Sequence, residues 1–408
     1  MKLMNCFHTA VVVVVLTGFA FTAYGQQSDL PQTILMDGKK LADTKMRIEK
    51  GDPALKPALD QLLAEANAVL EQGPYTVTDK EVIPPSGDKH DYASYGRYWW
   101  PDPEKADGLP YIHRDGETNP ESQSSKASDR RRIQRIGIHN QTLGLAYYFT
   151  GEEKYAKKAA ELLRVWFLDP ETRMNPNLNH AQCRRGHNTG SNSGVLDGRM
   201  MVPALEGSLL IAGSSALTAE ERQGIKDWAG EYLKWLQTGK LPLLEAASTN
   251  NHGSFYDVQA MYFALYSGNK DVAAQIAEKA IERRILSQIQ PDGTMPAELR
   301  RTRPNFYSCY NLHAMCLIAN LAQKVDVDIW HAGDQRLRVA LDYWAPYADP
   351  SKPWPHKSIR ENWRMYLYPI LLMGDRAYPE GKYLEKLEKL PLRDRQRRIE
   401  NLAFPLMQ

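Results

Sequence analysis

Apolar residues recur at helical spacing through most of the chain after residue 55. One stripe runs along residues 133–147, and a second follows the break at Gly151 and covers residues 155–166. A third covers residues 255–265 and ends at Gly268 and Asn269, after which a further helix is predicted from Asp271 to about Leu286. The stripes consist of Ile133, Ile136, Leu143 and Tyr147, of Tyr155, Ala159, Leu162, Leu163 and Trp166, and of Phe255, Val258, Tyr262 and Leu265. This pattern predicts helices that pair into successive hairpins.

The hairpins form a single all-α domain in this interpretation. No long stretch alternates strictly between apolar and polar residues, and no Gly/Ser/Pro-rich linker divides the chain. At roughly 30 to 50 residues per hairpin, about six or seven hairpins would close into an (α/α) toroid, an incomplete barrel around a central cleft. An open solenoid of hairpins has the same local pattern, so periodicity alone leaves both arrangements open.

Two long segments, residues 82–125 and 169–197, lack helical periodicity. Both are rich in glycine, proline, asparagine, aromatic and charged residues. Segments of this length without regular structure are usually functional loops. We therefore expect long loops over the central cleft, where they contact the substrate.

The first 25 residues have the pattern of a signal peptide. Lys2 precedes an apolar run from Ala10 to Leu16, and the small residues Ala23 and Gly25 follow it. The run is shorter than the ~20 apolar residues that a membrane-spanning helix needs. We expect a secreted or periplasmic protein without a membrane span, whose catalytic domain covers residues 26–408.

Charge and cysteine content narrow the function classes. The formal net charge is +2, and removal of residues 1–25 takes away only Lys2. A nearly neutral chain is not typical of general nucleic-acid binding, which needs a basic domain or stripe, whereas an anionic polymer can still bind in a local cleft. Cys183, Cys309 and Cys316 are an odd, widely spaced set, so no disulfide framework is predicted.

An asparagine-histidine pair directly precedes one predicted helix. Asn251 offers an amide, and His252 offers a ring that titrates near neutral pH. From a helix N-terminus, both side chains can project into a cleft. The alternative is that Asn250 or Asn251 only caps the helix while His252 is packed.

Three arginines precede two tyrosines at the start of another predicted helix. They are Arg300, Arg301 and Arg303, followed by Tyr307 and Tyr310. Arginine side chains bind carboxylates through two hydrogen bonds, and nearby cations would lower the pKa of a tyrosine from its usual ~10. The alternative is a solvated basic loop beside a tyrosine of the core.

The loops and helix starts supply candidate substrate-binding residues. Aromatic rings can stack on the apolar faces of sugars, while lysine and histidine can meet acidic groups. The substrate-binding candidates are Lys89, His90, Tyr92, Trp99, Trp100, Gln182, His187, Tyr256 and Arg303. One of the two tryptophans is expected to hold the loop to the domain instead.

A metal site is not predicted. His180, Cys183 and His187 lie close together in the second loop, but zinc usually takes three or four protein ligands and no partner motif completes this set.

Together these segments resemble the alginate-lyase superfamily of polysaccharide lyases. The matching stretches are Asn250 to Gly253 with Tyr256 to Gln259, Pro291 to Tyr307, and Asn175 to Asp197. Arg300, Tyr307 and Tyr310 reproduce a spacing of polysaccharide lyase family five, although Ser308 and Cys309 replace its usual histidine and asparagine. The segment from Lys89 to Arg114 looks more like family thirty-eight. The resemblance implies an (α/α) toroid and leaves the polymer uncertain.

The resemblance also implies a reaction, β-elimination on a uronic-acid polymer, most simply polymannuronate in alginate. Asn251, His252 and Arg300 would neutralise the uronate carboxylate while a base removes H5. In mannuronate, H5 and O4 lie on one ring face, so Tyr307 could serve as base and acid. In guluronate they lie on opposite faces, which would call for His252 or His187 as the base. No metal or organic cofactor is required, and glucuronan is an alternative substrate.

Two rival functions stay open at this level. A glycoside hydrolase on the same toroid would need a pair of carboxylates across the bond, for which the candidates are Asp91, Asp197, Asp257 and Glu298. A non-catalytic glycan-binding protein would need only the aromatic loop. The oligomeric state is not predictable from these patterns.

Overall fold

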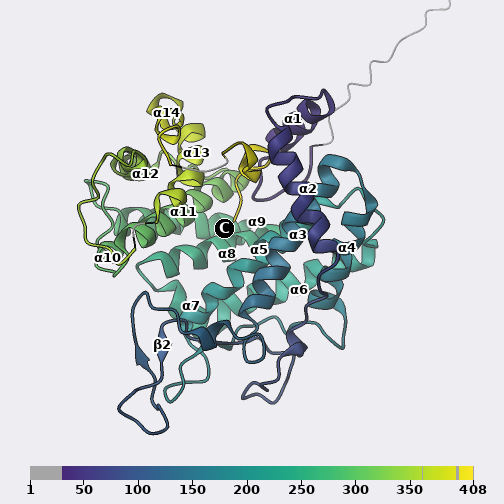
Figure 1. The fold of residues 1–408 in the computed structure, drawn as a ribbon, viewed down its shortest axis with the longest axis vertical. Helices are drawn as coiled ribbons and strands as arrows, with labels where there is room; N and C mark the ends of the chain where they lie inside the picture. Colours follow the sequence, from purple (N-terminus) through teal and green to yellow (C-terminus); the bar gives the residue numbers. More distant parts are fainter. Residues whose placement is uncertain (1–29, 361, 392–394, 408) are drawn as a thin grey trace, which may run out of the picture.

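The computed structural model describes residues 30–360, 362–391 and 395–407, and within them it is the predicted all-α toroid (Figure 1). The predicted signal peptide lies outside the described residues. No helix of the described part is long and apolar enough to cross a membrane. The α-helices are α1 (Gly38–Glu49), α2 (Lys56–Leu70), α3 (Arg130–Thr150), α4 (Glu153–Leu163), α5 (Met201–Leu210), α6 (Ala219–Thr238), α7 (Lys240–Ala246), α8 (Asn251–Ser267), α9 (Lys270–Ala280), α10 (Pro296–Leu299), α11 (Pro304–Ala322), α12 (Ala332–Trp344), α13 (Leu367–Ala377) and α14 (Tyr383–Leu387).

The hairpins predicted from periodicity are present. Gly151 ends α3 with a positive φ of 70°, and Gly268 ends α8 with a φ of 86°, a conformation that glycine adopts without steric cost. The partner helices α4 and α9 follow at once, and each continues into a short π-helical segment, Arg164–Leu168 and Ile281–Leu286. The apolar stripes therefore predicted both element type and position.

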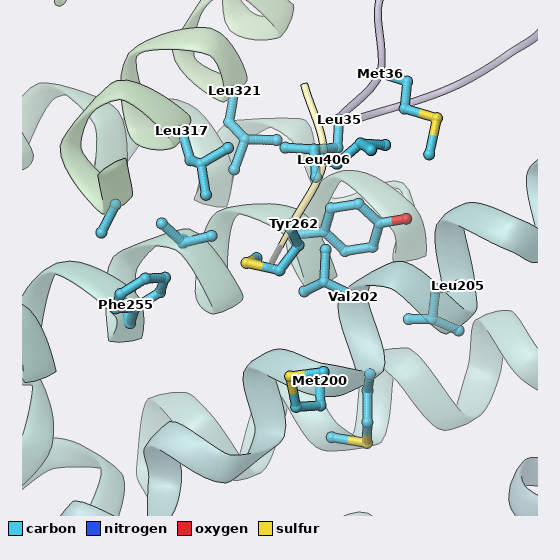
Figure 2. Close-up of a cluster of buried hydrophobic side chains, with 14 of the residues drawn as sticks. Leu35, Met36, Met200, Val202, Leu205, Phe255, Tyr262, Leu317, Leu321 and Leu406 are labelled. Carbon is cyan, nitrogen blue, oxygen red and sulfur yellow. The ribbon is translucent and has the colours of Figure 1, made fainter. Parts of the chain in front are cut away.

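The core lies where α5, α8 and α11 meet. Val202 and Leu205 of α5, Tyr262 of α8, and Leu317 and Leu321 of α11 pack together there (Figure 2). The first and last described segments close over the same core, with Leu35, Met36 and Leu406 in the cluster. Helix α8 is buried on nearly every side, so its sequence carries little amphipathic contrast.

Short strands tie the two long loops together. Strand β1 (Ala93–Tyr95) pairs in parallel with β4 (His180–Cys183), so residues 82–125 lie beside residues 169–197. Strand β2 (Trp99–Trp100) pairs antiparallel with β3 (Ile112–His113) in a hairpin, which extends below α7 in Figure 1. Both segments were predicted as irregular loops, and pairs this short carry too few residues to show alternation.

A buried ion cluster holds the start of α8. Both oxygens of Asp257 accept from Arg283 and Arg284. Arg284 also donates to the carbonyls of Ala246 at 2.6 Å and Ser248 at 2.8 Å. These bonds fix the segment between α7 and α8, which leads directly into Asn251 and His252 at the start of α8.

We expect Gly253→Ala to lower the free energy of unfolding by about 1 to 3 kcal/mol or more, the usual cost of overpacking. A Cβ at Gly253 would lie 2.0 Å from the Ser248 carbonyl oxygen and 2.6 Å from Arg284. The control is Gly230→Ala in the interior of α6, where the nearest atom is 3.8 Å away and alanine favours the helix. Urea denaturation would measure both variants, and equal stabilities would contradict this close packing.

Candidate active site

A cavity of about 220 Å³ opens between the paired loops and the N-terminal ends of α8 and α11. Of the residues proposed from sequence, it brings together Trp99, Gln182, Asn251, His252 and Tyr307. The complete lining is Arg97, Tyr98, Trp99, His113, Arg130, Ile133, Gln134, Gln182, Arg184, Ser193, Leu196, Asp197, Arg199, Met200, Asn251, His252, Arg301, Phe306, Tyr307 and Tyr310.

His252 is held from behind by a buried carboxylate. Its Nδ1 lies 2.5 Å from Oε1 of Glu245, a residue of α7 whose side chain is 1% exposed. Burial lowers the pKa of His252, but the charge and hydrogen bond of Glu245 outweigh this, and the net pKa is raised. A protonated His252 can donate from Nε2 to an anion, and a neutral one can accept a proton there.

Asn251 is held by a second buried carboxylate. Glu298 accepts the backbone N–H of Asn251 at 2.6 Å and its side-chain Nδ2 at 3.0 Å. Asn250 caps α8 instead, because its side chain accepts the N–H of His252 at 3.0 Å. Asn251 is therefore free of the capping role and lines the cavity with its amide oriented by Glu298.

Tyr307 lies between a hydroxyl and a cation. Its Oη is 2.7 Å from that of Tyr98, and the Arg301 guanidinium carbon is 3.7 Å from its ring centroid. Burial raises the pKa of Tyr307, and Tyr98 adds to the rise, while Arg301 opposes it. The expectation of a lowered pKa was therefore wrong, because desolvation of a side chain 5% exposed outweighs the nearby cation. Tyr307 is a neutral phenol at neutral pH, and thus a proton donor.

The structure places Arg301, not Arg300, in the cavity. Arg300 is exposed at the end of α10 and does not line the cavity. Arg301 pairs with Asp115, which lies two residues after β3, at 2.5 Å. Burial raises the pKa of Asp115, but Arg301 and the Thr302 backbone N–H lower it further, to about 2. The sequence spacing indicated Arg300 instead of its neighbour Arg301, because α10 is only four residues long and the following turn has no periodicity.

The cavity contains more cations than the sequence patterns indicated. Arg97, Arg130, Arg184 and Arg199 line it together with Arg301. They come from different loops and helices, and no common spacing marks them. Arg184 belongs to the second predicted loop. In the structure its guanidinium carbon lies 4.8 Å from the ring centroid of Trp99. An array of arginines around one cavity suits a polyanion.

Asp197 joins the two loops beneath the cavity. It accepts hydrogen bonds from Tyr92 at 3.0 Å, Ser94 at 2.8 Å and Gln182 at 3.0 Å. Arg130 pairs with it at 3.2 Å. Gln182 has a φ of 48°, a left-handed conformation that costs a non-glycine residue roughly 1 to 2 kcal/mol. In this conformation the side chain of Gln182 lines the cavity and donates a hydrogen bond to Asp197.

Several proposed substrate-binding residues lie elsewhere. Tyr92 is fully buried, and Tyr256 is 6% exposed with its hydroxyl bonded to the Leu236 carbonyl, so neither ring is available to a sugar. From the sequence alone, a tyrosine that hydrogen-bonds inside the core cannot be distinguished from one that stacks on a sugar ring. The remaining candidates outside the cavity lining are Lys89, His90, Trp100, His187 and Arg303.

Some of these residues support the lining from outside. His187 makes an edge-to-face contact with Trp99, with ring centroids 5.0 Å apart, and its Nε2 bonds the Tyr111 carbonyl at 2.8 Å. Trp100 donates to the Glu117 carbonyl at 3.0 Å. Of the two tryptophans, Trp99 thus lines the cavity and Trp100 holds the hairpin.

We expect Trp99→Ala to raise the KM for polymer, because it removes a cavity-lining ring and the stacking partner of Arg184. Trp100→Ala is the matched control, since it removes an equal ring from the neighbouring position outside the cavity. Steady-state kinetics would distinguish them. An equal rise in KM for both variants would show that the hairpin acts only as a whole.

The cavity does not have the carboxylate pair of a glycoside hydrolase. Among the residues that the structure describes, Asp197 is the only carboxylate in the lining, and four donors already occupy it. Asp257 and Glu298 are buried against their own partners, and Asp91 lies outside the lining. Within the described residues no group of three or more His, Cys, Asp or Glu side chains could hold a metal ion.

Comparisons with known proteins identify the family of the chain. A family model described as alginate lyase matches residues 76–354. An alginate lyase from Bacteroides ovatus is 36% identical, with a TM-score of 0.86 over 92% of this chain and 100% of that one. Alginate lyase A1-III from Sphingomonas species A1 shares the fold, at 16% identity and a TM-score of 0.56 over 93% of this chain and 99% of that one. No curated protein sequence matches. The chain belongs to the alginate lyase family of polysaccharide lyases.

Proposed function

We propose that this enzyme depolymerises alginate by β-elimination and leaves 4,5-unsaturated uronate ends. The observation that carries the proposal is the contact of Tyr307 with Tyr98 and Arg301 in a cavity lined by five arginines and His252. It combines a proton-transfer group with cations for a carboxylate. The 36% identical relative that is described as an alginate lyase supports the choice of polymer.

Removal of H5 places negative charge next to a carboxylate that is already ionised. Fixed donors and cations around that carboxylate lower the barrier, because they stabilise the enediolate more than the ground state. Arg301 and protonated His252 are suited to this task. Asn251 lines the same cavity, with its Nδ2 held by both oxygens of Glu298.

Tyr307 then carries the proton transfers in the proposed mechanism. As a neutral phenol it donates a proton to O4 as the C4–O4 bond breaks. To remove H5 first, it must start as a phenolate that has released its proton to solvent, a state that Arg301 favours and that burial and Tyr98 oppose. The proton taken from C5 then passes from Tyr307 to O4. On mannuronate, where both atoms lie on one ring face, Tyr307 serves both steps. On guluronate, neutral His252 is the base and Tyr307 the acid.

A panel of polymers tests the substrate. We expect rapid formation of the ultraviolet-absorbing unsaturated product from polymannuronate, slower formation from polyguluronate, and little from glucuronan, hyaluronan or chondroitin. Unsaturated product from glucuronan alone would contradict the assignment to alginate while keeping the reaction type. Binding of every polymer without any product would instead favour a glycan-binding protein.

We also propose that the protein is exported and that the mature chain begins near Gln26, as the pattern of residues 1–25 suggests. N-terminal sequencing of protein recovered from the periplasm or medium tests this. An intact Met1 on the functional protein would contradict it.

A further inference from the structure

A buried carboxylate outside the cavity controls the ring of His252. Glu245 does not line the cavity, yet its Oε1 is 2.5 Å from Nδ1 of His252. Its Oε2 accepts from Nδ2 of Asn192 at 3.0 Å. Because a carboxylate only accepts hydrogen bonds, Nδ1 must carry a proton in this arrangement. Nε2 is therefore the nitrogen available to a substrate.

We propose that Glu245 is a positioning residue that fixes the Nδ1–H form of His252 and keeps the ring cationic toward the substrate carboxylate. The carboxylate in question rests on the proposed function, since it is the uronate of the polymer. The arrangement of Glu245 and His252 itself does not depend on the choice of polymer.

The charges around His252 show why Glu245 decides its state. Burial lowers the pKa of His252, Glu245 from α7 raises it most, Glu298 from α10 raises it further, and Arg301 lowers it. The same cavity is lined by Arg184, Arg199, Asp197 and Tyr307. Two of these four are further cations. Without Glu245, only Glu298 would oppose the lowering of the His252 pKa by burial and Arg301.

Glu245→Gln removes the charge and keeps the shape. If its NH2 group faces Nδ2 of Asn192, two donors meet, and if it faces Nδ1 of His252, it favours the neutral ring that carries its proton on Nε2. We expect the pKa of His252 to fall by at least about one unit, because a close opposite charge shifts a pKa by about 1 to 3 units. The double variant Glu245→Gln with Asn192→Asp restores the pairing, since the amide can donate to the new carboxylate and accept from Nδ1. We expect it to recover the Nδ1–H form.

Nuclear magnetic resonance of ring-labelled histidines in the substrate-free enzyme tests the proposal, with the His252 signal identified by its loss in His252→Gln. In the parent we expect Nδ1 to stay protonated through the titration. A neutral parent ring that carries its proton on Nε2 would overturn the proposal, even if the variants fail to fold. So would a Glu245→Gln enzyme that titrates at the parent pH.

The pH dependence of kcat separates positioning from structural support. Activity that needs the His252 cation is lost as pH rises through its pKa, so in Glu245→Gln this loss should occur about one pH unit or more lower. The control is Glu206→Gln, a buried carboxylate of α5 that accepts from Leu35, Met36 and Tyr262. It should lower stability and leave the profile unchanged. Identical profiles for both variants would overturn the proposal. If the parent enzyme is inactive on alginate but gives the expected magnetic resonance result, the proposed substrate is contradicted and the proposed role of Glu245 is not.

Discussion

Tyr307→Phe is expected to lower turnover by at least about 100-fold, the loss typical of a removed general acid or base. The substitution removes only the hydroxyl, and the ring keeps its packing against Phe306 and its contact with Arg301. Fold and polymer binding should therefore stay close to those of the parent. Initial rates of unsaturated product formation at saturating polymer measure the effect.

The partner hydroxyl supplies the matched control for this experiment. Tyr98→Phe removes the hydrogen bond to Tyr307 and leaves the proton donor itself in place. We expect a smaller loss than in Tyr307→Phe, and a double variant no worse than Tyr307→Phe, because the two groups serve one step. A Tyr307→Phe enzyme that works at nearly the parent rate would refute the assignment, and Tyr310, which also lines the cavity, would become the candidate.

Arg301→Ala should lower kcat/KM by about 100-fold or more, as expected when a donor that stabilises developing negative charge is lost. It removes the cation at 3.7 Å from the Tyr307 ring centroid and leaves Asp115 without its ion-pair partner. Arg300→Ala is an unusually close control, because it removes the same side chain one residue earlier, at an exposed position. It should retain nearly the parent kcat/KM.

Asp115→Asn separates catalysis from loop closure in the Arg301 experiment. It breaks the ion pair between the segment after β3 and Arg301 but leaves the guanidinium in the cavity. We expect only part of the Arg301→Ala loss. A larger loss of kcat/KM in Arg300→Ala than in Arg301→Ala would show that Arg300, as the sequence spacing predicts, and not Arg301 is the arginine that acts on the substrate.

The fold was predictable because helical burial repeats. The stripes at residues 133–147 and 255–265 each extend over several turns, and Gly151 and Gly268 mark where they stop. The short strands β1 to β4 could not be predicted from the sequence, since two to four residues cannot establish an alternating pattern of apolar and polar positions.

The site was predictable at two helix starts and, for Trp99 and Gln182, in the two long loops. Asn251, His252 and Tyr307 lie in the first turns of α8 and α11, and all three line the cavity. Glu245 lies seven residues before His252 across a helix break, a separation that carries no sequence signal. Arg184 and Arg199 come from segments without periodicity, so only the fold gathers them.

The most direct test of β-elimination is to let the enzyme digest polymannuronate in water enriched with heavy oxygen and to weigh the oligosaccharides by mass spectrometry. Elimination breaks the C4–O4 bond without adding water, so we predict products with a C4–C5 double bond and no heavy oxygen introduced at the cleaved bond. Hydrolysis would add one water per bond. Saturated products that carry the heavy oxygen would contradict the proposed reaction.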